Sequence, residues 1–142
     1  MDVKERLNEA WYCHQQIQAQ LDDIERLRSL AERVTSTISP TAGCSGGTGD
    51  RIPNAVARII ELEESVADSI AELREARENV ERYINDSFPP GVTRVVLYRR
   101  YILMQRWERI ATDMCYSIKW IWKLHSRALR TLEELKEAGE SD

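Results

Sequence analysis

An apolar residue recurs every seven positions in the middle of the chain, and this repeat constrains the fold more than any other feature. The members of the repeat are Ile59, Val66, Leu73 and Val80. An interleaved row, which two charged residues interrupt, consists of Val56, Glu63, Ile70, Arg77 and Ile84. Seven-residue spacing is typical of helices that pack side by side as a coiled coil. We therefore expect one long helix over residues 53–85, with an apolar stripe that must pack on another helix.

A helix is also predicted over residues 3–34, where apolar residues recur at steps of three and four. Its stripe consists of Leu7, Trp11, Ile17, Leu21, Ile24, Leu27, Ala31 and Val34. Residues 35–50 contain Pro40, four glycines and a cluster of Ser and Thr, so we expect a flexible connector there. This connector permits an antiparallel hairpin within one chain and equally permits a homodimer through these N-terminal helices. The spacing does not choose between them.

The segment Ser87–Gly91 reads SFPPG and should end the long helix. Pro89 and Pro90 lack the backbone N–H of a helix and disfavour a helical residue before them. We expect a helical scaffold over residues 1–86 and a second module over residues 92–138. The expected fold class is all-α, with a long N-terminal helical hairpin or coiled coil followed by a three-helix module.

Charge is distributed unevenly along the chain. Residues 1–91 hold ten Lys and Arg against seventeen Asp and Glu. Residues 92–132 hold nine Lys and Arg against only Glu108 and Asp113, and residues 133–142 are acidic again. The net charge of −4 therefore conceals a strongly basic module. A basic segment attached to an acidic one indicates a nucleic-acid-binding module.

The basic module contains three predicted helices, over residues 92–102, 107–114 and 118–138. The residues expected to form its core are Trp107, Ile110, Ala111, Ile121, Leu124 and Leu132. Cys115 and Tyr116 form a short break, and Ser117 is a suitable N-cap for the last helix. A helix, a tight turn and a capped second helix are typical of a helix-turn-helix, whose last helix enters the major groove of DNA.

Several other classes of protein are not expected. The sequence has no glycine-rich phosphate loop, nucleophile elbow or carboxylate pair, so we expect no enzyme and no cofactor. Three cysteines and two histidines are scattered along the chain, which argues against a metal site and a disulfide framework. No apolar run is long enough for a membrane span, and the N-terminus does not resemble a secretory signal. A cytoplasmic protein is therefore expected.

Several residues of the basic module resemble a known family when they are taken as a set. They are Tyr101-Ile102, Trp107-Glu108-Arg109-Ile110-Ala111, Met114-Cys115-Tyr116-Ser117, Ile121, Leu124, His125, Arg127-Ala128-Leu129 and Leu132. This set resembles the fourth region of primary-type sigma factors. It is more similar still to phage- and prophage-encoded regulators of late genes, the RinA and ArpU relatives. The resemblance covers about residues 92–135 and implies a sigma-like helix-turn-helix that binds double-stranded DNA, with RNA polymerase as a second partner.

The resemblance also implies roles for individual residues. The base-reading positions on the recognition helix correspond to Ile118, Lys119, Trp122 and Lys123. Phosphate contacts are expected from Arg94, Arg99, Arg100, Arg106, Ser117, Arg127 and Arg130. Ile118 and Trp122 depart from the polar readers that are common in the family. Cys115 departs as well, because it occupies a turn position that usually has positive φ and Gly or Asn, at a cost of about 1 kcal/mol.

These observations favour a phage-type DNA-binding transcriptional regulator. A small-terminase-like DNA-packaging subunit is the first alternative, because it also combines a helix-turn-helix with helical oligomerisation. The second alternative is a helical protein–protein interaction module in which Trp120 and Trp122 bind another protein.

Overall fold

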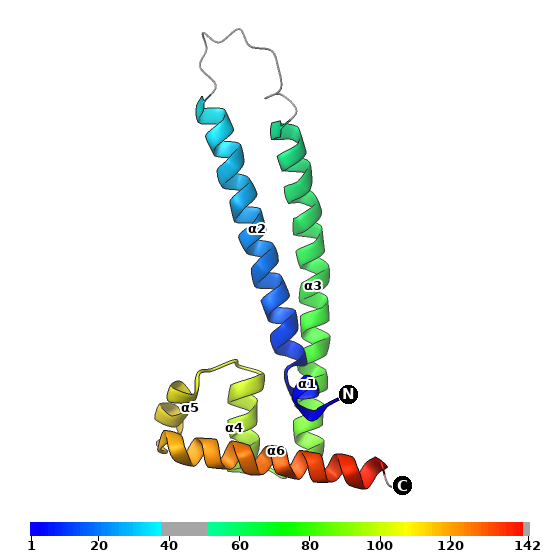
Figure 1. Ribbon diagram of the computed structural model, residues 1–142, viewed down its shortest axis with the longest axis vertical. Coiled ribbons are helices and arrows are strands. Elements are labelled where there is room, and N and C mark those ends of the chain that lie inside the picture. The colour runs from blue at the N-terminus through cyan, green and yellow to red at the C-terminus, as the bar shows by residue number, and fades with distance from the viewer. Residues whose placement is uncertain (38–50, 141–142) are drawn as a thin grey trace. The chain divides into compact units, whose positions relative to one another are not determined.

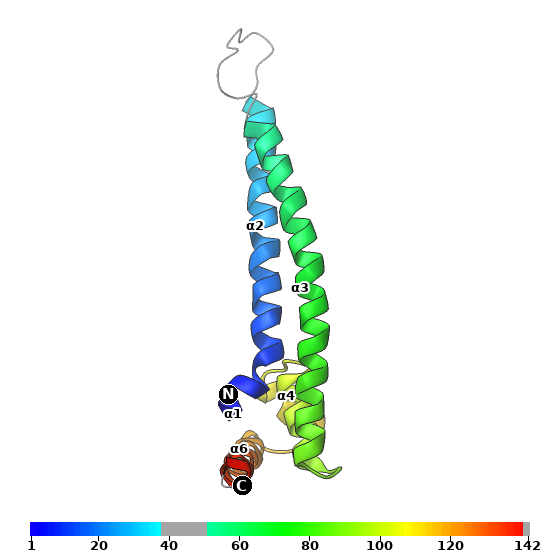
Figure 2. The ribbon, with the colours of Figure 1, turned by 90° about the vertical axis from the view of Figure 1, so that its right-hand side faces the viewer.

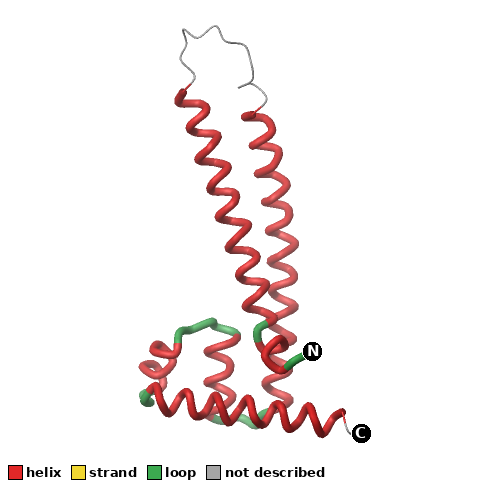
Figure 3. Tube along the Cα trace, in the orientation of Figure 1, coloured by secondary structure: helices red, strands yellow, loops and turns green. Residues whose placement is uncertain are grey.

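A computed structural model describes residues 1–37 and 51–140, and every regular element in these ranges is an α-helix (Figures 1 and 3). The helices are α1 (Val3–Leu7), α2 (Glu9–Thr37), α3 (Arg51–Ser87), α4 (Val92–Tyr101), α5 (Trp107–Met114) and α6 (Ile118–Glu140). The expected all-α class is confirmed. The chain divides into two compact units. The hairpin unit comprises His14–Glu72, and the terminal unit comprises Met1–Cys13 and Leu73–Asp142.

The hairpin unit consists of two antiparallel helical segments from α2 and α3 that lie side by side (Figures 1 and 2). Its core is formed by Ile24, Leu27 and Leu62, with Ile59 and Val66 packed against them. The long helices therefore pair within one chain, which decides between the two arrangements that the spacing left open for this seam.

Polar contacts also join the helices of the hairpin unit. The Gln20 Nε2 group donates to Ser65 Oγ at 2.9 Å. The Arg28 guanidinium pairs with the Glu63 carboxylate at 2.8 Å. The Arg28 side chain is 61% exposed and the Glu63 side chain is 50% exposed. Solvent therefore screens this ion pair, and it contributes less to stability than the apolar core does.

The sequence predicts the period of the α3 stripe correctly but misplaces one of its two rows. Ile59, Val66, Leu73 and Val80 are buried or half-buried, as expected. The companion row is Ala55, Leu62, Ser69 and Ala76, which are all buried. The prediction that the interleaved row is buried is wrong for Val56 and Ile70, which are exposed. Three of these four residues are Ala or Ser, and a search for large apolar residues does not find such a row.

The prediction of one helix over residues 3–34 is wrong at Asn8, which separates α1 from α2. The Asn8 side-chain amide donates to the Lys4 carbonyl at 3.0 Å and so satisfies a group at the end of α1. On the predicted stripe, Trp11 and Leu21 are exposed. At its other end α2 continues to Thr37, so residues 35–37 of the predicted connector are helical, and its residues 38–50 lie outside the described residues.

The terminal unit has a core that joins the first residues of the chain to its last helices. This core combines α1 with the end of α3, with α4 and with α6. Its most deeply buried side chains are Val3, Leu7, Ala10, Ala76, Val80, Ile84, Leu97, Ala128 and Leu132. Figure 1 shows α1 beside α6, in agreement with their contacts. The C-terminal helices are therefore not packed by themselves, and residues 1–13 complete their core.

The predicted helix break at Ser87–Gly91 is confirmed. Helix α3 ends at Ser87 and α4 begins at Val92. The Arg94 guanidinium closes this break, because it donates to the carbonyl of Phe88 at 2.6 Å and 3.1 Å and to that of Asn85 at 3.0 Å. These bonds satisfy carbonyl groups that a helix leaves without partners at its C-terminus.

None of the helices in the described ranges combines the length and the apolar composition that crossing a bilayer requires.

Leu7→Ala tests whether the N-terminal segment is part of the terminal core. Leu7 is fully buried, so the substitution should lower the free energy of unfolding of the terminal unit by about 2–5 kcal/mol. Leu135→Ala on α6 is the matched control, because Leu135 is half exposed and its truncation should cost less than about 0.5 kcal/mol. Urea unfolding followed by tryptophan fluorescence measures both. Equal stabilities of the two variants would contradict this packing.

Candidate nucleic-acid interface

Helices α5 and α6 are joined by a three-residue turn whose two ends are both capped. The Cys115 N–H donates to the carbonyls of Ala111 and Thr112, and the Tyr116 N–H donates to the Ala111 carbonyl at 3.0 Å. This is the bonding of a Schellman motif, which ends α5 at Met114. At the other side of the turn, Ser117 Oγ accepts from the Trp120 N–H at 3.2 Å. The prediction that Ser117 caps α6 is confirmed.

A small apolar cluster fixes α5 on the first turns of α6. It consists of Val96, Ile110, Ala111, Ile121 and Leu124, with Trp107, Met114 and Ile118 packed against it. The core residues expected in α5 and α6 are buried, apart from a half-buried Trp107. The cluster holds one side of α6 and leaves the opposite side exposed.

The exposed side of α6 carries a row of cations. Lys119, Lys123 and Arg130 recur at helical spacing opposite the buried residues, and all three are exposed. They form no salt bridge with any residue that the structure describes. Beyond Arg130 the exposed side becomes acidic, with Glu133, Glu134, Glu137 and Glu140. The positive potential of α6 is therefore confined to its first half.

Two tryptophans flank this row. The Trp120 ring has the Lys123 ammonium 6.0 Å and the Arg127 guanidinium 5.6 Å from its centroid. Such cation–π contacts limit the positions that these long side chains sample. Trp122 is 46% exposed on the other flank. Of the four expected base-reading residues, Lys119, Trp122 and Lys123 are thus exposed, whereas Ile118 is half-buried against the core cluster.

Three of the arginines expected at phosphates bond to the protein itself. Arg94 caps α3, as described above. Arg99 pairs with Asp113 at 3.1 Å and also donates to Gln105 Oε1. Arg100 donates to the Gln105 carbonyl at 3.0 Å and lies over the Trp107 ring, 4.4 Å from its centroid. The other three arginines, which are Arg106, Arg127 and Arg130, are exposed.

Asp113 neutralises two arginines at once. Besides its pair with Arg99, it accepts from Arg109 Nε at 3.0 Å. The Arg109 pair spans four residues on α5, a spacing that can be read from sequence. The Arg99 pair joins residues fourteen apart on two different helices, so no local spacing reveals it.

His125 lies among aromatic rings between α4, α5 and α6. The Tyr101 hydroxyl forms a hydrogen bond with His125 Nε2, and the Trp107 ring meets the imidazole edge to face at 4.7 Å. Burial lowers the pKa of His125 to about 4, and the nearby charges of Arg100 and Lys4 act in the same direction. Burial also raises the pKa of Tyr101 above its usual value of 10.0. The imidazole is therefore neutral at pH 7 and joins three helices.

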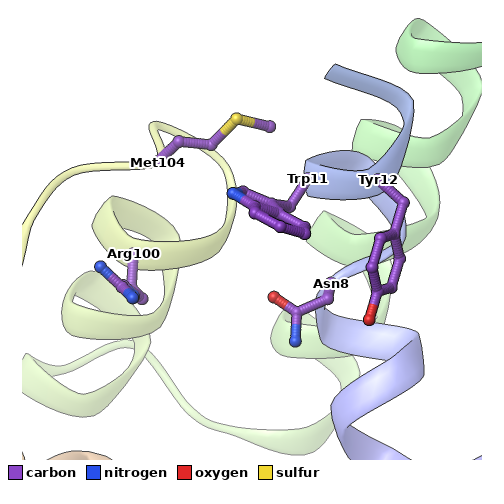
Figure 4. Close-up of a pocket in the computed structure, with 5 residues that line it drawn as sticks. All are labelled: Asn8, Trp11, Tyr12, Arg100 and Met104. Carbon is purple, nitrogen blue, oxygen red and sulfur yellow. The ribbon is translucent and has the colours of Figure 1, made fainter. Parts of the chain in front are cut away.

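A surface cavity of about 290 Å³ lies elsewhere in the terminal unit, lined by Asn8, Trp11, Tyr12, Arg100 and Met104 (Figure 4). The rings of Trp11 and Tyr12 meet edge to face at 5.2 Å. Figure 4 shows the indole of Trp11 directed toward the segment that carries Met104. Within residues 1–37 and 51–140, His, Cys, Asp and Glu form no group of three that could hold a metal ion.

Comparison with protein-family models, with curated proteins and with solved structures found no match for this chain.

Cys115→Gly tests the backbone of the turn. Cys115 is exposed and has φ 58° and ψ 38°, the left-handed conformation that the turn was expected to require. Glycine adopts it without a steric cost, so the substitution should raise the free energy of unfolding by up to about 1 kcal/mol. Cys115→Val should lower it instead, because a β-branched residue is disfavoured at positive φ. Chemical denaturation of both variants measures the difference, and the opposite order would contradict the assigned turn.

His125→Gln tests the buried imidazole through the pH dependence of stability. Because the pKa of His125 is lower in the folded state, its contribution is complete above about pH 6.5 and decreases as the pH falls toward 4. Over this pH range the free energy of unfolding should fall by about 1–2 kcal/mol, a value already reduced for the partial exposure of the ring. The variant should lack this part of the dependence between pH 6.5 and 5, a range above most carboxylate titrations. Parallel stability curves for wild type and variant would contradict the neutral state.

Proposed function

We propose that α4, α5 and α6 form a sigma-like helix-turn-helix that docks on double-stranded DNA, and that the protein is a phage-type regulator of transcription. The observation that carries the proposal is the exposed cation row on the first half of α6, formed by Lys119, Lys123 and Arg130. This row lies on the second of two helices that a capped three-residue turn joins. An α-helix fits the major groove of B-DNA, where such a second helix reads base edges.

Different side chains would take different parts in docking. Lys119 and Lys123 point away from the core and can donate to guanine O6 and N7. Arg106, Arg127 and Arg130 are exposed and suit phosphates, which carry no sequence information but fix the register of the protein on the duplex. The Ser117 hydroxyl accepts from the Trp120 N–H and keeps its own proton for a phosphate oxygen.

The hydrogen bonds of Arg94, Arg99 and Arg100 indicate that these residues hold parts of the terminal unit in place. Each guanidinium donates to a carbonyl or carboxylate group of the terminal unit. Phosphate contact by these three residues would first require them to leave those partners. The proposal therefore assigns the backbone contacts to Arg106, Arg127 and Arg130.

The resemblance to sigma region 4 and to the RinA and ArpU relatives supports the regulatory part of the proposal, with RNA polymerase as a further partner. A DNA-packaging subunit remains the alternative with the same DNA-docking unit. It would assemble as a ring of many subunits, so the molecular mass in solution separates the two.

A charge reversal on α6 tests DNA docking directly. The double variant Lys119→Glu and Lys123→Glu should weaken duplex binding at least about a hundredfold, because both side chains would face the groove. For the wild type, three cationic phosphate contacts per unit predict a slope of log K against log salt of about −3. Fluorescence anisotropy with a labelled duplex measures both quantities.

Arg58→Glu in the hairpin unit is the control, because it is an exposed cation outside the terminal unit. If Arg58→Glu lost as much affinity as the α6 variant, the DNA-binding surface would not be confined to α6. Absence of duplex binding by the wild type at low salt would overturn the proposal. Selection of duplexes from a random pool tests sequence reading, and failure to enrich a motif would contradict the regulatory role alone.

A further inference from the structure

Helix α3 carries a second row of mostly apolar residues, which no described residue covers. Val56, Ile60 and Ile70 are 46%, 51% and 47% exposed. With Glu63 and Ala67 between them, they recur at steps of four, three, four and three. We call these five residues the outer seam. Each lies one residue after a member of the row that packs on α2, so the outer seam is about 100° around the helix from it.

A groove adjoins the outer seam between α2 and α3. Its volume is about 490 Å³, and it is lined by Leu21, Ile24, Glu25, Arg28, Glu63 and Val66. Ile24 and Val66 also belong to the core of the hairpin unit, so this core reaches solvent at the groove. Glu63 belongs to both the groove and the outer seam, which places the two on the same side of the hairpin.

The described part of the hairpin core contains the cluster of Ile24, Leu27 and Leu62, with Ile59 and Val66 packed against it, and Ala55 and Ser69 are buried as well. On α3 the row that faces α2 therefore consists of Ala55, Ile59, Leu62, Val66 and Ser69, and the outer seam runs beside it. A helix with two adjacent seven-residue rows is typical of a four-helix bundle, in which each helix packs on two neighbours. Within the described residues of the hairpin unit, α2 is the one helix that packs on α3.

We propose that two copies of the chain pair through the outer seam and its groove and form a four-helix bundle from two hairpin units. The first reason for a second copy is continuity, because the pairing would cover the same Ile24 and Val66 that form the intrachain core. The second reason is charge. Arg28 pairs with Glu63 within the chain. A two-fold axis can bring the same guanidinium beside Glu25 of the second copy, because both residues line the groove.

The pairing does not depend on DNA binding, so the molecular mass of the full chain without DNA tests it. Light scattering and sedimentation equilibrium should give a dimer for the wild type. The variant Ile60→Glu and Ile70→Glu should raise the dimer dissociation constant at least about a hundredfold, because burying the carboxylates is costly. The variant Ile60→Ala and Ile70→Ala should also weaken the dimer, and alanine favours the helix, so this variant keeps its fold.

Leu30→Glu is the matched control. Leu30 is 48% exposed and nine residues from Leu21, which places it on the opposite side of α2. This variant should remain dimeric, with circular dichroism reporting helix content for all variants. A monomeric wild type, a ring of many subunits, or a dimer that persists in both seam variants would overturn the proposal. Dissociation by Leu30→Glu as strong as that of the seam variants would also overturn it.

Discussion

The attachment of α6 to two separate apolar clusters is the constraint on which the rest of the terminal unit depends. Ile121 and Leu124 pack with α5, whereas Ala128 and Leu132 pack with α1 and the end of α3. Helix α6 therefore connects α5 to the N-terminal helix α1. Because both clusters lie on the same side of α6, the other side stays exposed along its whole length.

This arrangement separates the cations of the basic segment into two groups. Arginines on α4 reach carbonyl and carboxylate groups nearby, since the planar guanidinium can donate several hydrogen bonds at once. Lys119, Lys123 and Arg130 on the exposed side of α6 form no ion pair with any residue that the structure describes. The net positive charge of the segment is thus partly structural, and the exposed remainder is concentrated on the first half of one helix. The DNA-docking proposal rests on that remainder.

In the hairpin unit the heptad pattern predicts part of the helix packing but not all of it. The spacing of Ile59 and Val66 predicts a helix with a buried row, and the structure confirms it. The partner of that row depends on which neighbouring helix approaches, and from which side. Ala55 and Ser69 are buried, whereas Val56 and Ile70 are exposed, although hydrophobicity favours the reverse. The uncovered row is the basis for the proposed pairing of two chains.

The sequence by itself determined the elements and most of their ends. Helical periodicity, the prolines after Ser87 and the Ser117 cap are local, because each acts within about one turn of the chain. The positive φ at Cys115 was expected only from the resemblance to sigma-like domains, because cysteine itself does not favour that conformation. Only the tertiary structure decided which residues share a core and which cations stay exposed. Leu7 meets α6, and Arg99 meets Asp113, through contacts between residues far apart in the chain, and no local pattern encodes such distances.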